Sequence, residues 1–481
     1  MSNTTHETAM NRINALLDEG SFVEVGSYVT ARNTDFNLQD QETPADGVVT
    51  GYGTMDGVLV YVYSQDASVL GGAIGEMHAK KIAAMYKMAM KMGTPVIGLV
   101  DCAGLRLQEA CDALDAFGGL YLNQTMASGV IPQITAIFGT CGGGMALVPS
   151  LTDFTFMEEK NAKLFVNAPN TLDGNKTCNT ASAEFQAKEA GLVDVVADEA
   201  TLMSKIRELV AVLPSNNEED QVVGECEDDL NRECAGIEAG VADTAYALSQ
   251  ISDSNFFYEL KADYGKEMVT AFIRLNGGTV GAVANRSAIT GEDGSSEDLD
   301  AVLTTEGCTK AAEFVDFCDA FNIPVLTLVN VKGFKADKVS EKSISRAAAK
   351  LTYAFANASV PKVTVIVGEA FGSAGLTMNS KSIGADIVYA WPTASIGMMD
   401  AASAVKIMYA DEIAKADSAV DLIAEKTAAY AELQSSAVAA AKRGYVDDII
   451  EPAGTRKRVI AAFEMLYTKR EDRPVKKHGT V

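Results

Sequence analysis

Short apolar runs that end in glycine-containing turns alternate along the chain with longer stretches of helical periodicity. Residues 51–65 predict a β-hairpin around Asp56 and Gly57, and residues 273–284 predict a second one around an Asn-Gly pair. Further strands are predicted at residues 96–100, 134–138, 325–329 and 363–367, and helices at residues 9–19, 113–128 and 343–357. This alternation predicts an α/β fold with βαβ crossovers and largely parallel sheets.

The chain contains the same unit twice. A shift of 229 positions takes Pro95 to Pro324, and the match stays ungapped over some fifty residues. The same shift relates Pro132 to Pro361, Gly139 to Gly368 and Gly143 to Gly372. We therefore predict two copies of one αβ unit and two related binding sites that serve one reaction.

An acidic stretch that begins at Pro214 and continues to Asp229 lies between the copies and is typical of a linker. We predict an N-terminal domain over residues 1–215, a connecting segment over 216–250 and a C-terminal domain over 251–481.

Composition narrows the function class. The 481 residues are 48% hydrophobic and carry a net charge of −25, which suits a packed globular protein and argues against a nucleic-acid binder. The eight cysteines form no C-x-x-C pair, so neither a zinc ribbon nor a redox motif is predicted. No apolar run reaches the roughly 20 residues of a membrane span, and the N-terminus lacks a signal-peptide core. A cytoplasmic protein is predicted.

Histidine is scarce. Of the three histidines, His6 and His478 lie in polar tails, and only His78 is interior. The chain therefore has too few histidines for a Ser-His-Asp site or a metal centre with several histidine ligands, and no metal site is predicted. Catalysis must rely on backbone groups, on carboxylates or on a cofactor that is supplied from outside.

Two glycine-rich turns, residues 139–144 and 368–375, follow equivalent predicted strands. Such a turn leaves backbone N–H groups unpaired and admits a ligand closely, so it can hold a carbonyl oxygen that becomes negative. The alternative is that the glycines only allow tight strand–helix packing. Repetition at equivalent positions favours an oxyanion hole in each copy.

The string of residues 89–92, Ala-Met-Lys-Met, matches the site where carrier domains bear biotin. Here it ends a predicted helix that begins near Met77 and is capped by Gly93, whereas a biotinylation site needs a hairpin tip. We predict a structural role for the string, so any biotin has to arrive on another chain.

Several basic residues allow two interpretations. The start of a predicted helix carries His78, Lys80 and Lys81, which either contact phosphates or form a solvated helix face. The same two interpretations apply to Arg106. The basic triplet of residues 456–458 is predicted to lie at the surface.

Specific motifs carry a family resemblance. In the first half they are Ser64-Gln65-Asp66, Gly71-Gly72, the run 78–81, Asp101 with Gly104, Arg106, Gln108 and Glu109, the run 128–134 and Thr152-Asp153-Phe154. In the second half they are the runs 317–324, 390–394 and 476–479. These motifs resemble the biotin-dependent acyl-CoA carboxyltransferases over nearly the whole chain from about residue 45 onward. The chain is similar both to the β subunit of propionyl- and acetyl-CoA carboxylases and to the carboxyltransferase subunit of sodium-pumping methylmalonyl-CoA and glutaconyl-CoA decarboxylases.

The resemblance implies tandem crotonase-like (ClpP/crotonase) ββα-superhelix domains assembled into a hexamer. Coenzyme A would bind the N-terminal domain, and biotin would reach it from the C-terminal domain of a partner chain. By the same resemblance, Gly143 and Gly144 form the oxyanion hole for the thioester, and Ser373 and Ala374 form the one for the ureido oxygen of biotin. Substrate-binding roles are predicted for Gly71, Gly72, His78, Lys81, Ala103, Gly104, Arg106, Gly142, Gly333, Phe334, Gly372 and Leu376.

The chain departs from the family at a few places. Ala103 and Leu105 replace the Gly and Ala of most relatives, and Leu376 replaces the acid of propionyl-CoA enzymes, which leaves the acyl preference open. The loop 330–337 and the run 346–349, both near the expected biotin position, differ in sequence from those of the family. The stretch 169–191 is shorter than in most relatives.

The leading hypothesis is a carboxyltransferase subunit that moves CO₂ between biotin on a carrier protein and the α-carbon of a short acyl-CoA, propionyl-/methylmalonyl-CoA or acetyl-/malonyl-CoA. Two or three backbone N–H groups can stabilise the enolate by several kcal/mol, and the nitrogen of biotin replaces a side-chain base. The implied partners are a biotin carboxyl carrier protein and either a biotin carboxylase or a membrane decarboxylase subunit, beside which the chain would be peripheral. A non-catalytic scaffold subunit and a crotonase-type hydratase are the alternatives.

Overall fold

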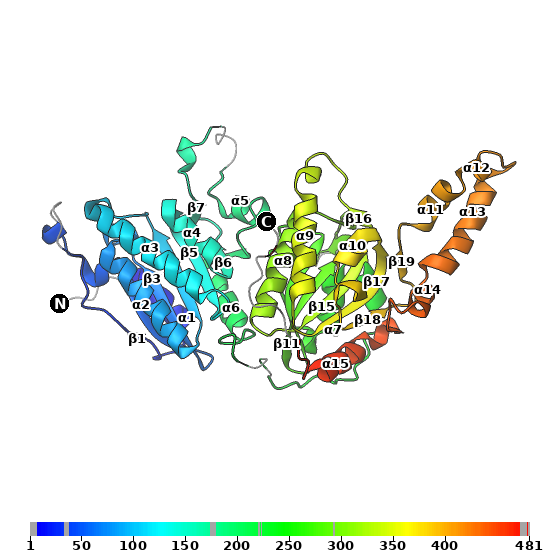
Figure 1. Cartoon of the computed structure of the whole chain (residues 1–481). Coiled ribbons are helices and arrows are strands. Elements are labelled where there is room, and N and C mark those ends of the chain that lie inside the picture. Colours follow the sequence, from blue (N-terminus) through cyan, green and yellow to red (C-terminus); the bar gives the residue numbers. More distant parts are fainter. Residues whose placement is uncertain are drawn as a thin grey trace. The chain divides into compact units, whose positions relative to one another are not determined.

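The computed structural model forms two compact units, Met1–Asp220 and Gln221–Val481, and we describe each by itself (Figure 1). The described residues are 7–32, 38–173, 179–219, 222, 224–291, 294–471 and 479. The motif residues 476–478, with His6 and Cys178, lie outside them.

The first unit is built on one mixed sheet in the order β1-β2-β3-β4-β5-β6-β8, with β7 paired to β5. Its strands are β1 (Val23–Glu24), β2 (Val48–Met55), β3 (Val58–Gln65), β4 (Val96–Cys102), β5 (Gln133–Gly142), β6 (Phe154–Glu158), β7 (Lys163–Phe165) and β8 (Val195–Ala197). Strands β2 and β3 form the predicted antiparallel hairpin, and Asp56 and Gly57 at its turn have φ of 49° and 83°. From β3 to β8 all pairings are parallel, which confirms the predicted crossovers.

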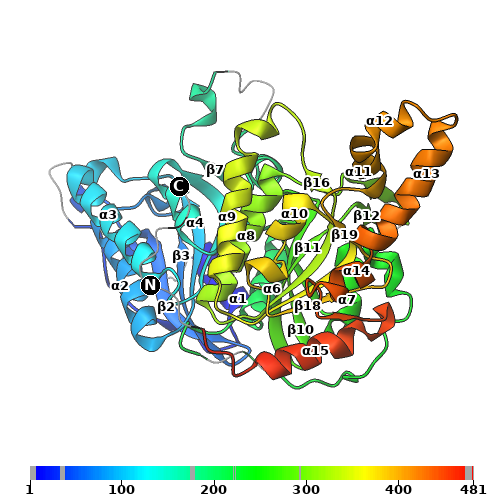
Figure 2. The same cartoon turned by 45° about the vertical axis from the view of Figure 1, so that its right-hand side comes forward.

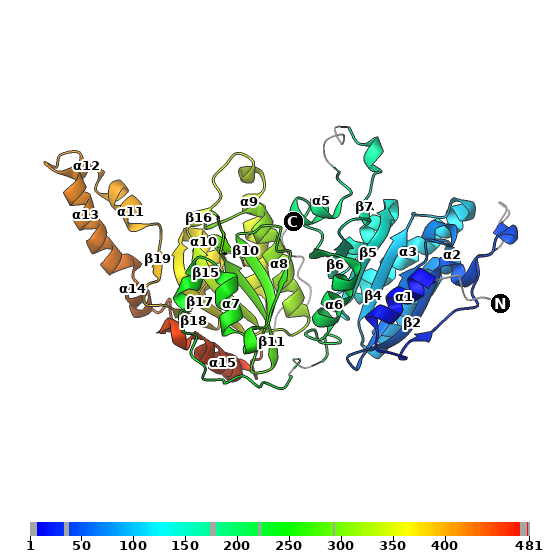
Figure 3. The same ribbon diagram turned by 180° about the vertical axis from the view of Figure 1, so that it is seen from behind.

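Helices cover both faces of this sheet, so β4 and β5 are buried almost throughout and read as continuous apolar runs. The helices are α1 (Glu7–Leu16), α2 (Glu76–Met92), α3 (Ala110–Ala127), α4 (Leu147–Leu151), α5 (Ala183–Lys188) and α6 (Glu199–Val210). Helices α2 and α3 lie side by side on one face, and α1 lies on the other (Figures 1 and 3). Helix α2 contains residues 89–92 and ends at Gly93 in the left-handed conformation, so the structural interpretation of that string is confirmed.

The second unit repeats the sheet in the same order, β20-β18-β17-β15-β11-β10-β9, with β19 paired to β17. Its strands are β9 (Phe257–Leu260), β10 (Met268–Leu275), β11 (Gly278–Asn285), β15 (Val325–Val331), β17 (Lys362–Phe371), β18 (Ile387–Ala390), β19 (Ser395–Gly397) and β20 (Asp448–Ile449). Two small ladders lie outside this sheet, one of β12 (Ala288–Thr290) with β13 (Ser296–Asp298) and one of β14 (Val302–Leu303) with β16 (Gly333–Phe334). The duplication seen in the sequence therefore extends to every strand of the main sheets.

Helices of the second unit follow the same plan and add an arm. They are α7 (Thr244–Ile251), α8 (Thr305–Ala320), α9 (Ile344–Asn357), α10 (Gly372–Thr377), α11 (Ala401–Met408), α12 (Ala410–Ile413), α13 (Ala419–Tyr430), α14 (Ala437–Lys442) and α15 (Thr455–Leu466). Helices α11 to α13 project away from the sheet, and no residue of α13 is buried (Figure 2). The first unit has no counterpart of this arm among its described residues.

Each unit fastens its hairpin turn with an aspartate and an arginine from elements at its two ends. In the first unit the Asp18 carboxylate accepts the backbone N–H groups of Asp56 (3.0 Å) and Gly57 (3.1 Å). Arg207 on α6 donates to Asp18 at 2.8 Å. These hydrogen bonds hold the pKa of Asp18 well below its usual range. We call this arrangement the clasp.

The second unit has the same clasp. Asp253 accepts the N–H groups of Asn276 (3.2 Å) and Gly277 (2.7 Å), and the Arg456 guanidinium lies 2.7 Å from Asp253. Arg456 is fully buried, so the prediction that residues 456–458 lie at the surface is wrong for this residue. The carboxylates that compensate its charge come from far away in the sequence, where the local pattern gives no sign of them.

Candidate functional site

The first glycine-rich turn joins β5 to the 3-10 turn η5 (Gly143–Ala146) and then to α4. Gly143 has φ of 62°, and a Cβ there would meet nothing within 4 Å, so the turn faces open space. Gly142 packs against the ring of Phe165, where a Cβ would lie only 2.8 Å from the ring. Amides in the first turn of a helix have no intrahelical acceptor. The geometry therefore suits an oxygen ligand at Gly143 and Gly144.

A loop from η3 (Leu70–Gly72) lies beside this turn. The N–H of Ala103 donates to the carbonyl of Gly71 at 3.0 Å, and a Cβ on Gly104 would lie 3.7 Å from the carbonyl oxygen of Gly142. A Cβ on Gly72 would lie 2.1 Å from the Asp101 carbonyl, so only glycine fits. The structure thus brings the predicted residues at the ends of β4 and β5 together with the predicted Gly-Gly loop.

Arg106 supports this loop from beneath. Its guanidinium lies 2.5 Å from Asp46 and 2.6 Å from Glu109, and it donates to the carbonyl of Ala73 at 2.9 Å. Burial raises the pKa of Asp46, and the adjacent Arg106 guanidinium partly offsets that effect. Arg106 therefore holds the loop in place from a buried position, and the substrate-binding role that the resemblance implies for it stays a prediction. Asp46 was missed because its surroundings in the sequence look like an ordinary turn.

His78 and Lys81 are buried as well. The two ring nitrogens of His78 lie 2.9 Å from the Asp46 carbonyl and 3.1 Å from the Gln65 amide nitrogen, and burial lowers the pKa of His78 to about 3. Lys81 donates to the carbonyl of Ala45 at 2.8 Å, and burial lowers the pKa of Lys81 to about 8. The solvated-face interpretation is therefore wrong for these two residues, and their predicted substrate-binding roles stay predictions.

Lys80, the third basic residue of that group, is exposed. It forms an ion pair of 2.5 Å with Glu76, one turn earlier on α2. The solvated-face interpretation describes this residue.

The second glycine-rich turn joins β17 to α10. Gly372 has φ of 57°, and the shift of 229 makes it the equivalent of Gly143. The equivalent of Gly144 is then Ser373, which is exposed, whereas Ala374 follows one position later and is buried. Structural equivalence therefore centres the second turn on Gly372 and Ser373.

A cavity of about 590 Å³ opens beside the second turn. Gly372, Ser373 and Leu376 line it from one side, and Tyr430, Gln434, Arg443 and Tyr445 line it from the arm and from the segment after α14. Leu376 is 50% exposed, and its equivalent in the first unit, Leu147, is 42% exposed. Each copy therefore places a half-exposed leucine just after its turn.

The predicted residues Gly333 and Phe334 form β16, which pairs with β14. The N–H of Lys332 donates to the carbonyl of Ala301 at 2.7 Å, which repeats the link between Ala103 and the Gly71 loop. The backbone scaffold is thus conserved between the copies while the side chains differ. Lys335, at the position of Arg106, is 43% exposed and lies 3.9 Å from Asp300.

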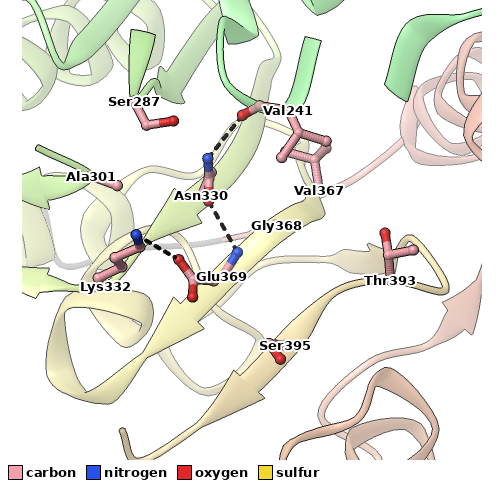
Figure 4. Close-up of a pocket in the computed structure, with 10 residues that line it drawn as sticks. All are labelled: Val241, Ser287, Ala301, Asn330, Lys332, Val367, Gly368, Glu369, Thr393 and Ser395. Carbon is pink, nitrogen blue, oxygen red and sulfur yellow. Dashed lines mark hydrogen bonds and ion pairs between the residues drawn. The ribbon is translucent and has the colours of Figure 1, made fainter. Parts of the chain in front are cut away.

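A second cavity of the C-terminal unit, about 460 Å³, lies at the carboxyl ends of β15 and β17 (Figure 4). Asn330 donates to the Val241 carbonyl at 2.8 Å and accepts the N–H of Glu369 at 3.1 Å, and Lys332 pairs with Glu369 at 3.5 Å. Ser287, Thr393 and Ser395 complete its polar lining.

The first unit fills the equivalent space. Arg12 lies over the Phe138 ring at 4.7 Å and 3.6 Å from Asp101, and these two partners correspond to Val367 and Asn330 in the second unit. At this position the two copies therefore differ: the Arg12 side chain fills the space in the first unit, and a cavity occupies it in the second.

The described residues contain no group of three or more His, Cys, Asp or Glu side chains that could hold a metal ion. Among them there is also no helix with both the length and the apolar character needed to cross a membrane.

The carboxyl transferase domain family matches residues 3–481. The methylmalonyl-CoA decarboxylase subunit alpha of Propionigenium modestum is 41% identical, over 98% of this chain and 93% of the relative. The propionyl-CoA carboxylase beta chain of Roseobacter denitrificans is 40% identical, over 98% and 93% of the two chains.

Among solved structures, one chain of the transcarboxylase 12S hexamer assembly with hydrolysed methylmalonyl-coenzyme A bound matches this chain with a TM-score of 0.91. It is 37% identical, over 98% of this chain and 92% of that one. The agreement extends over both units and confirms the crotonase-like fold that the sequence motifs imply.

Proposed function

The chain belongs to the carboxyl transferase family, and on that premise we propose that it transfers a carboxyl group between biotin on a separate carrier chain and the α-carbon of a short acyl-CoA. The observation that carries the proposal is the repeated strand-to-helix turn. Gly143 and Gly372 have the same left-handed conformation at equivalent positions, so two turns of one shape are available to two carbonyl groups. A hydratase of the same fold class needs only one such turn.

The first unit supplies the acyl-CoA side. An enolate forms when the α-carbon of a thioester loses a proton or CO₂, and its negative oxygen needs fixed N–H donors. We assign this role to the amides of Gly143 and Gly144, and the paired Gly71 and Ala103 backbones lie next to the same turn through Gly104. The buried ion pair of Arg106 with Asp46 supports the adjacent loop, because breaking such a pair costs several kcal/mol.

The second unit supplies the biotin side. The exposed Ser373 and the 590 Å³ cavity beside it leave room for a bicyclic ring at the turn, so the residues fit a ureido oxygen held by backbone amides. When bound, biotin supplies the nitrogen that accepts or gives up the carboxyl group. The chain needs no base of its own for this reaction. His78, the interior histidine, has both ring nitrogens engaged inside the first unit.

The substrates we propose are propionyl- and methylmalonyl-CoA or acetyl- and malonyl-CoA. Partners would be a biotin carboxyl carrier protein with a biotin carboxylase or a membrane decarboxylase subunit, and further copies of this chain in a hexamer. The hexameric transcarboxylase 12S and the decarboxylase and carboxylase subunits among the relatives support this assignment.

The test is decarboxylation by the purified full chain with free biotin and methylmalonyl-CoA or malonyl-CoA. We expect biotin-dependent release of CO₂ with saturation in the CoA ester. Binding of the ester without turnover of either compound would refute the proposal and favour a scaffold subunit. The charged side chains Lys332, Lys335 and Glu369 near the second turn are the observation that favours that alternative. Co-purification with a biotin carboxylase or with a membrane subunit would decide the direction.

A further inference from the structure

Helix α3 is seated directly on the first turn through two aromatic side chains. The Tyr121 hydroxyl donates a hydrogen bond to the Gly144 carbonyl at 2.6 Å. Phe117, one helical turn earlier, meets the Tyr121 ring edge to face at 4.9 Å. A Cβ on Gly144 would lie 2.8 Å from Phe117 and 3.1 Å from the Tyr121 oxygen, so glycine is required beneath them.

The Gly144 carbonyl has a second donor, the N–H of Leu147. Two donors on one oxygen fix the plane of the peptide that links Gly144 to Met145, and so restrict the rotation of Gly144 itself. The two glycines of the turn carry no side chains, and Gly143 faces open space, so neighbouring groups have to fix their backbone. A thiol from β5 assists at the next peptide, where Cys141 donates to the Met145 carbonyl at 3.4 Å.

The second copy lacks the tyrosine. The shift of 229 places Lys350 at the position of Tyr121 and Arg346 at that of Phe117. The Lys350 ammonium lies 3.2 Å from Glu313 on α8, away from the turn. The aromatic support therefore belongs to the copy that we assign to the thioester.

A purely structural role would require only the ring. Tyr121 could then be replaced by phenylalanine without loss of turnover, because the ring contact with Phe117 would remain. The hydroxyl adds a neutral donor that persists at physiological pH, since burial raises the pKa of the phenol above its ordinary value.

We propose that Tyr121 is a positioning residue for carboxyl transfer: its hydroxyl holds the Gly144 peptide so that the turn amides stay directed at the thioester oxygen as negative charge develops. This inference rests on the proposed function of the first turn. Small displacements of such donors are costly, because productive geometry has to be kept within about 0.5 Å.

The test compares Tyr121→Phe with Tyr52→Phe, which removes a hydroxyl from β2 of the same unit. Kinetics use methylmalonyl-CoA and free biotin. For Tyr121→Phe we expect kcat to fall about tenfold, the size of one ordinary hydrogen bond, while KM for the CoA ester stays unchanged and the melting temperature falls by no more than a few degrees. Amide hydrogen exchange should rise in residues 142–146 and not in residues 371–375. Tyr52→Phe should match the wild type in all four measurements.

Unchanged kcat and unchanged exchange in Tyr121→Phe would overturn the inference. So would a parallel change in kcat, KM and melting temperature, which marks a general packing defect. If the wild type shows no turnover, the proposed function fails, and the exchange data still decide whether Tyr121 holds the turn.

Discussion

The Arg106 guanidinium lies 2.5 Å from the Asp46 carboxylate, and both side chains are shielded from water. Removing one partner of a buried ion pair leaves the other charge without compensation. We expect Asp46→Ala to lower the free energy of unfolding of the first unit by about 3–5 kcal/mol, measured by urea denaturation. Lys80→Ala, which breaks the exposed pair with Glu76, is the control and should have little effect. Equal unfolding midpoints for the two variants would contradict the prediction.

Asp153 should make stability depend on pH. Its carboxylate accepts the N–H of Gln133 at 2.8 Å, and desolvation raises the pKa of Asp153 to about 7. The unfolded chain has a value near 3.9, so between about pH 4 and pH 7 the folded state holds a proton that the unfolded state has lost. This contribution to stability therefore falls as the pH rises through that window, and it levels off above about pH 7.

Asp153→Asn keeps an oxygen acceptor for Gln133 but cannot titrate. Relative to the wild type, the variant should gain stability as the pH rises from 5.5 to 7.5, which urea denaturation at both values would measure. A difference that is independent of pH would show that Asp153 does not titrate in this range.

Gly143 should matter for catalysis because of its position and not because of its backbone strain. Gly143→Ala and Gly57→Ala both place a Cβ on a left-handed residue with open space around it, so both should carry a similar strain of about 1 kcal/mol. Only Gly143→Ala places that Cβ in the open space where the thioester oxygen is proposed to bind, and we expect a loss of about 10²-fold in kcat. Decarboxylation kinetics check this, and similar rates for both variants would argue against the first oxyanion hole.

Ser373→Val should weaken the biotin side alone. A branched side chain at this exposed position would crowd the second turn and its cavity. We expect kcat/KM for free biotin to fall at least about tenfold while the affinity for methylmalonyl-CoA, measured by calorimetry, is kept. Ser249→Val on α7 is the matched control. A parallel loss of CoA-ester affinity would speak against separate sites.

Local patterns predicted the elements well wherever a turn has a strong chemical signature. Residue types that favour the left-handed conformation mark the two hairpin turns, at Asp56 and Asn276, and the end of α2 at Gly93. These turns could therefore be predicted from the sequence. The repeat predicted the equivalence of the two turns, and the resemblance predicted the fold.

Burial of charged residues could not be predicted in the same way. His78 and Lys81 lie on a helix whose sequence is compatible with solvent, and the segment around Asp46, which is distant in the sequence, covers them. The hydroxyl of Tyr121 was missed because its partner is a backbone carbonyl, which leaves no trace in the side-chain pattern. The second cavity results from smaller residues at separate positions, such as Val367, and no single motif marks it.

The clasp has a consequence for how the two halves can vary. Asp18 with Arg207, and Asp253 with Arg456, connect a segment just after an early helix and the last long helix of a unit to that unit's own hairpin. All residues of a clasp belong to one unit. A substitution that disrupts the hairpin of one unit therefore leaves the hydrogen bonds and ion pair of the other clasp intact. Each half of the chain is therefore free to accumulate substitutions under its own constraints, as the packed space beneath Asp101 and the hollow one beneath Asn330 illustrate.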